Sequence, residues 1–280
     1  MSGVSSPKGQ FEPIHSAHAI EQVIFTLQFE RSIDESIFSE VRKTSEQFKP
    51  ELPGLLETPQ GFPNMLSLGM PAFGFPGMPG NGFMLRRVAP SGLVENELRV
   101  TDSSLTFRNM TYSRWNAVWS QANSYFKALV PIFIKQTRVS GISINYVDKF
   151  AWSGNITAFN PNLLLRAGSK YLCPHVLDAK DLWHSHTGAF IRVDKHTKRL
   201  LNVNVDVMDE NRLGEVHRIV SITTVLTDLL NQPGYETFVS EESDVVGFID
   251  THMQGLHAFG KEVFGNIIND EMSKRIALIE

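Results

Sequence analysis

Three strand-like runs in succession near the C-terminus, followed by one long helical run, restrict the possible folds more than any other feature. The runs cover 189–193, 200–208 and 217–230. The middle run alternates, with Leu201, Val203, Val205 and Val207 on one face and Asn202, Asn204, Asp206 and Met208 on the other. A Pro-Gly turn then precedes a helix predicted over 241–268. The predicted inner face of this helix consists of apolar residues: Val245, Ile249, Leu256, Val263 and Ile267. Consecutive strands ahead of a helix indicate an antiparallel sheet rather than alternating β-α units.

The N-terminal half repeats this mixture of strands and helices. Strands are predicted over 17–29, 83–88, 97–107 and 138–150, and helices over 34–49 and 112–130. Ser32 and Glu35 have the spacing of a capping box at the start of the first helix. Trp115 and Trp119 belong to an apolar stripe at helical spacing in the second, and we expect Pro131 to end it.

This order predicts an α+β fold with largely antiparallel sheets packed on one side by long helices, and it allows two structurally related halves. We expect a flexible leader over 1–14, an N-terminal half over 15–152, and a C-terminal half over 153–280 that shares the core. The stretch 153–182 has no clear periodicity apart from a short helix predicted after Pro161.

The segment 53–84 has an unusual composition. It contains six prolines, seven glycines, four methionines and four phenylalanines, with one charged residue, Glu57. Proline and glycine at this density oppose a regular helix or strand. Two interpretations remain open: a loop that covers the chain's own sheet, or an adaptable apolar contact for a partner. The partner-contact candidates are Phe62, Met70, Phe73, Phe75 and Met78.

Composition narrows the class of protein. The formal net charge of -4 does not indicate a nucleic-acid binder that acts through bulk positive charge. The single cysteine, Cys173, allows no disulfide within the chain and fits a reducing, cytoplasmic location. The polar first dozen residues lack the apolar core of a secretion signal, and no run approaches the roughly 20 apolar residues of a membrane span.

Motifs for known chemistry are missing from the sequence. It has no phosphate-binding GxxxxGK[ST] loop, no HExxH, no GxSxG and no GxGxxG after a strand. The best metal candidates are Asp181, His184 and His186, because two histidines two apart on an extended chain share a face. A further ligand would come from elsewhere, such as His175 or Asp206. The alternative is a set of surface histidines that bind no metal.

Polar side chains on the middle strand form a second candidate site. Asn202, Asn204 and Asp206 lie in a row on one face and could line a cleft for a small polar ligand, or face solvent as an ordinary sheet surface. Asp206 and Asp148 could act as a carboxylate pair only if the fold brings them together. No cofactor is indicated.

The stretch 105–150, with Tyr112, Trp115 and the strand Ile142-Ser143-Ile144-Asn145-Tyr146-Val147, resembles a bacterial family of about this length. Members of that family are sporadically distributed and functionally uncharacterised. The opening strand over 19–29 and the helix that holds Leu256, His257 and Phe264 fit the same resemblance. The resemblance implies no activity and no catalytic residues, and the patchy distribution implies an association with defence or mobile elements.

Taken together, these features favour a non-catalytic binding or assembly protein, either an oligomer or one component of a bacterial complex. The alternatives are a metal-assisted hydrolase built on Asp181, His184 and His186, and a small-ligand sensor that uses Asn202, Asn204 and Asp206.

Overall fold

The computed structural model describes residues 9–58, 82–212, 214–236 and 245–278. The fold is α+β, with a large antiparallel sheet and four α-helices among these residues, as the sequence predicts. The residues form two compact units. Unit 1 takes the described residues of Met1–Val23, Ser143–Tyr235 and His252–Glu280, and unit 2 takes those of Ile24–Ile142 and Glu236–Thr251. Strands β2 (Ile20–Phe29) and β7 (Val139–Trp152) and helix α3 (Val245–Ile267) contribute residues to both units.

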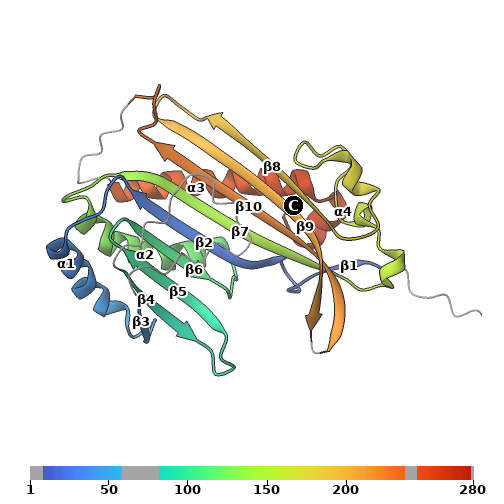
Figure 1. Cartoon of the computed structure of the whole chain (residues 1–280), viewed down its shortest axis with the longest axis horizontal. Helices are drawn as coiled ribbons and strands as arrows, with labels where there is room; N and C mark the ends of the chain where they lie inside the picture. The colour runs from blue at the N-terminus through green and yellow to red at the C-terminus, as the bar shows by residue number, and fades with distance from the viewer. Residues whose placement is uncertain (1–8, 59–81, 213, 237–244, 279–280) are drawn as a thin grey trace, which may run out of the picture. The chain divides into compact units, whose positions relative to one another are not determined.

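In unit 1 the strand order is β7-β10-β9-β8, with β1 (Phe11–Pro13) paired to β7 (Figure 1). The other strands are β8 (Trp183–Arg192), β9 (Thr197–Arg212) and β10 (Glu215–Leu230), all antiparallel to their neighbours. The predicted runs 200–208 and 217–230 lie inside β9 and β10. The run 189–193 underestimates β8, which begins six residues earlier because Trp183–Gly188 also pairs with β9.

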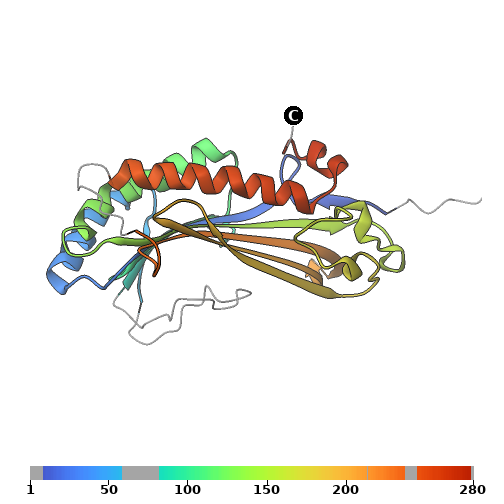
Figure 2. The same ribbon diagram turned by 90° about the horizontal axis from the view of Figure 1, so that it is seen from above.

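The unit 1 part of α3 lies along one face of this sheet (Figure 2). Tyr146 Oη of β7 lies 2.8 Å from His257 Nδ1 of α3, and Phe150 stacks on Phe264. The residues predicted for the inner face of α3 are all buried: Val245, Ile249, Leu256, Val263 and Ile267. Short 3-10 turns η3 (Ile156–Ala158), η4 (Pro161–Leu163) and η5 (Pro174–Leu177) occupy the predicted irregular stretch, and α4 (Asp270–Arg275) follows α3.

In unit 2 the strand order is β3-β4-β5-β6-β2. The strands are β3 (Gly54–Thr58), β4 (Gly82–Val88), β5 (Val94–Thr101) and β6 (Ser104–Asn109), and the helices are α1 (Glu35–Ser45), followed by η1 (Glu46–Phe48), and α2 (Trp115–Phe133). Phe25 of β2 contacts Trp115 and Trp119 of α2, so both tryptophans of the predicted apolar stripe belong to an aromatic cluster. The predicted strand 97–107 is in fact two strands, because Asp102 and Ser103 form a tight connection between β5 and β6.

The predicted cap of α1 and the predicted end of α2 are wrong. The N-cap of α1 is Asp34, not Ser32, because the Asp34 carboxylate accepts hydrogen bonds from the N–H groups of Ser36 and Ile37, both at 3.0 Å. Helix α2 continues past Pro131 to Phe133. Burial of Ile132 and Phe133, whose ring stacks on Phe29 with centroids 4.3 Å apart, offsets the hydrogen bond that proline cannot make.

Candidate binding surface

The two faces of the unit 1 sheet differ in what covers them. On β9 the odd-numbered residues face α3, since Arg199 binds Asp228, which in turn contacts His252 of α3. Leu201, Val203 and Val205 are buried on that face. The even-numbered residues Asn202, Asn204 and Asp206 therefore lie together on the opposite face, as predicted, and all three are half-buried.

The β8–β9 pairing brings the predicted histidines to this polar face. His184 lies opposite Asp206, and His186 lies opposite Asn204. Asn204 Nδ2 donates a hydrogen bond of 2.6 Å to Asp206 Oδ2. Burial raises the pKa of the Asp206 carboxyl group, and the imidazoles of His184 and His186 act in the opposite direction. The face thus carries one half-buried carboxyl group between hydrogen-bonding neighbours.

Asp181 is not part of this group. Its side chain is 91% exposed and lies 3.6 Å from Arg218 Nη2, and Arg218 shares the α3 side of β10 with Asp228. His184 and His186 lie on the other face. Within the described ranges, no three histidine, cysteine or acidic side chains are placed so that they could hold a metal ion. The structure does not bring together Asp181, His184 and His186 as a metal site.

Asp148 and Asp206 are also separated. Asp148 lies between Tyr146 and Phe150 in the β7 alternation, so it points to the α3 side, away from Asp206. The Asp148 side chain is buried, and burial raises its pKa to about 8. The two aspartates therefore cannot act as a carboxylate pair.

The outer edge of β8 is the second feature of this surface. Val193 N–H donates to the Thr197 carbonyl at 3.1 Å, which makes Val193 and Thr197 a hydrogen-bonded pair. The register continues without a shift along β8, so the odd-numbered residues bond to β9 and the even-numbered residues direct their backbone groups outward. In the part of the chain that the structure describes, β9 is the only strand paired with β8.

Apolar side chains at the end of β8 accompany this edge. Phe190 is 61% exposed and Val193 is 44% exposed. Lys198 Nζ lies 4.3 Å from the centroid of the Phe190 ring and covers part of it. β8 has no proline and no lysine, two of the features that prevent an edge from pairing with another strand, and its one arginine, Arg192, stands at its last position. This edge therefore presents backbone groups that no other described strand pairs.

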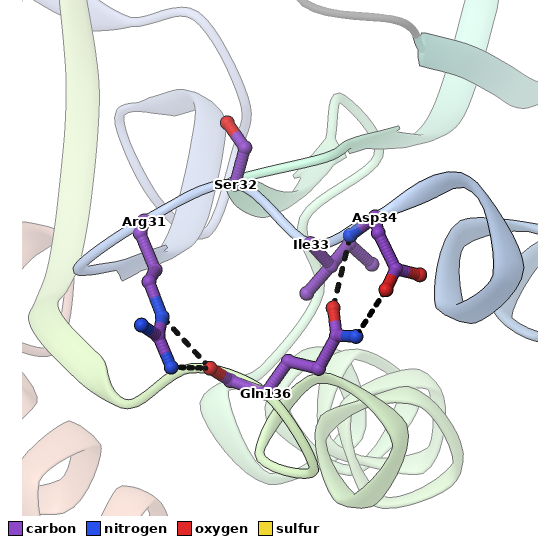
Figure 3. Close-up of a pocket in the computed structure, with 5 residues that line it drawn as sticks. All are labelled: Arg31, Ser32, Ile33, Asp34 and Gln136. Atoms are coloured by element: carbon purple, nitrogen blue, oxygen red, sulfur yellow. Dashed lines mark hydrogen bonds between the residues drawn. The ribbon is translucent and has the colours of Figure 1, made fainter.

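The pocket in unit 2 between the end of β2 and the end of α2 has a different character (Figure 3). Arg31 Nε donates to the Gln136 carbonyl at 2.9 Å, while the Gln136 side chain bonds both the Asp34 N–H, at 2.9 Å, and the Asp34 carboxylate. The Ser32 side chain points away from Gln136. Because these groups satisfy one another, they act as a clamp between two segments rather than as a ligand site.

A buried ion network in unit 1 gave no signal in the sequence. Asp228 is fully buried and accepts hydrogen bonds from Arg199 at 2.6 and 2.9 Å, with His252 Nδ1 at 2.7 Å. Burial alone would raise the pKa of Asp228, but the bonds from Arg199 and His252 outweigh it and lower the pKa. Both carboxylate oxygens bond to the chain's own groups, so the network is structural.

The predicted partner contacts Phe62, Met70, Phe73, Phe75 and Met78 lie outside the described residues. The described helices include none long and apolar enough to cross a membrane. Neither a scan against protein-family models nor a search of curated proteins finds a match for this chain.

Proposed function

We propose that this chain is a non-catalytic protein-binding component that takes up a β-strand of its partner at the outer edge of β8. The observation that carries the proposal is the outward row of backbone groups at Gly188 and Phe190, which no other described strand pairs. Strand addition uses such backbone groups for affinity and the neighbouring side chains for specificity.

The polar face beside the edge supplies that specificity. The side chains of His184 and His186 lie on the edge strand itself and share a face with Asn204 and Asp206 of β9. A strand added beside β8 would place every second side chain on this same face. A partner strand with hydrogen-bonding side chains at alternate positions fits these imidazoles and the amide and carboxyl groups behind them.

A photo-crosslinking experiment in living cells tests this function. p-Benzoylphenylalanine replaces either Phe190 on β8 or Leu93, which lies between β4 and β5 and is 71% exposed. Both positions are exposed and apolar, so Leu93 is the matched control for random collisions. We expect a discrete polypeptide adduct from position 190 and none from position 93. No adduct at 190, or equal adducts at both positions, would contradict the proposal.

A second candidate function, the binding of a small polar ligand on the face of Asn202, Asn204 and Asp206, is supported by the half-burial of Asp206 and the pairing of His184 with it. A thermal-shift screen with nucleotides tests it. A stabilisation that disappears in Asn204→Ala but persists in Phe190→Ala would favour this function, and no stabilisation by any nucleotide would count against it.

A further inference from the structure

We infer that the strand taken up at β8 belongs to a second copy of the chain, so that two β8 strands pair antiparallel about a two-fold axis at Thr187. This inference rests on the proposed function and names its partner. Two-fold symmetry requires a surface that complements itself, and most homo-oligomers use it.

The outward-facing positions match in this register. The backbone groups of His184 meet those of Phe190 in the second copy, and symmetry repeats the pair at the other end. On the polar face this places an imidazole beside an exposed aromatic ring. Gly188, which has no side chain, lies opposite His186 and leaves space for its imidazole. No like charges oppose each other along this row.

The opposed pairs on the α3 side also fit. Thr187 faces its own counterpart, and Trp183 faces Ile191 of the second copy. Threonine pairs and aromatic–β-branched pairs are both favourable across antiparallel strands. Ser185 faces Ala189, which is a combination of two small residues. The buried indole Nε1 of Trp183, which has no hydrogen-bond partner among the described residues, lies at the end of this row.

The chain's own segments cover one half of β8 and leave the other half exposed, which also suits two-fold pairing. Cys173 N–H donates to Ser185 Oγ at 3.5 Å, and Thr187 Oγ1 donates to the Tyr171 carbonyl at 3.0 Å, so 171–173 covers the first half of the strand. Ala189 and Phe190 in the second half are exposed. Antiparallel pairing about Thr187 brings the covered half of one copy beside the exposed half of the other.

Light scattering after size-exclusion chromatography of the full chain tests the pairing. Phe190→Pro removes an outward N–H, which makes no bond to β9, whereas Phe190→Val removes the ring but keeps this N–H. We expect the fraction of dimer in the wild type to rise with protein concentration. Phe190→Pro removes two symmetry-related hydrogen bonds and should weaken association at least tenfold more than Phe190→Val does. Equal effects of the two variants would overturn the inference.

Disulfide trapping tests the register with the edge backbone intact. In a Cys173→Ser background, Thr187→Cys places two cysteines at about 4.5 Å between Cα atoms, within the range that a disulfide spans. Ala189→Cys places them roughly 13 Å apart. We expect oxidation to link Thr187→Cys only. Trapping of Ala189→Cys alone, or of neither variant, would overturn the register at Thr187.

The two proposals fail in different ways. A chain that stays monomeric at every concentration, while Phe190 still crosslinks to another protein in cells, rejects self-pairing and keeps the proposed function. A monomeric chain with no adduct at Phe190 rejects both.

Discussion

His184 and Asp206 lie opposite each other on β8 and β9, and the imidazole opposes the effect of burial on the Asp206 carboxyl group. We expect His184→Ala to raise the pKa of Asp206 further, because burial then acts with less opposition. Titration of the Asp206 carboxyl carbon by NMR measures this pKa. His175→Ala, at an exposed position of η5, is the control and should leave it unchanged. A lower pKa in His184→Ala would contradict this arrangement.

Asp148 should make stability depend on pH. Its pKa is raised from 3.8 to about 8, so the folded chain holds a proton that the unfolded chain releases, and stability falls as pH rises through this window. Asp148→Asn removes the effect. We expect the variant to be more stable than wild type by a few kcal/mol at pH 9, with little difference near pH 4. Urea unfolding across this pH range measures the free energies.

His257 has the opposite effect on the pH dependence of stability, so it predicts the profile that remains when Asp148 is replaced. Burial, with a smaller effect of Lys261, lowers the pKa of His257 from 6.5 to about 4, so stability falls as pH decreases between these values. Between about pH 4 and 6.5, Asp148 makes stability fall with rising pH, whereas His257 makes stability rise. In Asp148→Asn, stability should therefore rise with pH up to about 6.5 and then level off. A continued fall between pH 6.5 and 8 in that variant would contradict the assignment to Asp148.

The Asp228 network should be important for folding. Asp228→Ala leaves the Arg199 guanidinium, with a side chain only 12% exposed, without its carboxylate, and we expect a loss of about 3–5 kcal/mol. Glu40→Gln is the control, since Glu40 forms an exposed pair with Lys135 at 2.6 Å and should cost at most about 1 kcal/mol. Chemical unfolding compares the variants. Similar losses of unfolding free energy in both variants would show that the buried network stabilises the fold no more than an exposed ion pair does.

Two substitutions distinguish the observed α1 cap, Asp34, from the cap predicted from the sequence, Ser32. The Ile37 N–H and the Gln136 amide are the main causes that lower the pKa of Asp34 to about 2, so its carboxylate is engaged in the folded chain. Asp34→Ala should lower the Tm, because the helix loses its cap and the Gln136 side chain loses its bond to the Asp34 carboxylate. Ser32→Ala should leave the Tm unchanged. If Ser32→Ala has the larger effect, the capping-box prediction is correct.

The sequence predicts the features that depend on local periodicity. The alternation of 200–208 predicts the two faces of β9, and the spacing of Val245, Ile249 and Leu256 predicts the inner face of α3. The same alternation predicts the polar row Asn202, Asn204 and Asp206. Ser32 and Asp34 are both good capping residues, so sequence alone could not show which one binds the helix N–H groups.

Features that depend on distant residues could not be predicted. Asp228, Arg199 and His252 come from two strands and a helix, and nothing in their spacing indicates contact. The edge position of β8 depends on strand order, which the hairpin between β8 and β9 does not determine. The extension of α2 past Pro131 depends on the tertiary burial of Phe133.

Residue-resolved amide hydrogen exchange on β8 tests the central claim most directly. In dilute protein, Ala189 and Ile191, which bond to β9, should exchange slowly, whereas Gly188 and Phe190 should exchange quickly. In concentrated protein, or with the protein captured at Phe190 added, Gly188 and Phe190 should become slow while Ala189 and Ile191 change little. If Gly188 and Phe190 exchange quickly under every one of these conditions, the edge of β8 does not take up a strand.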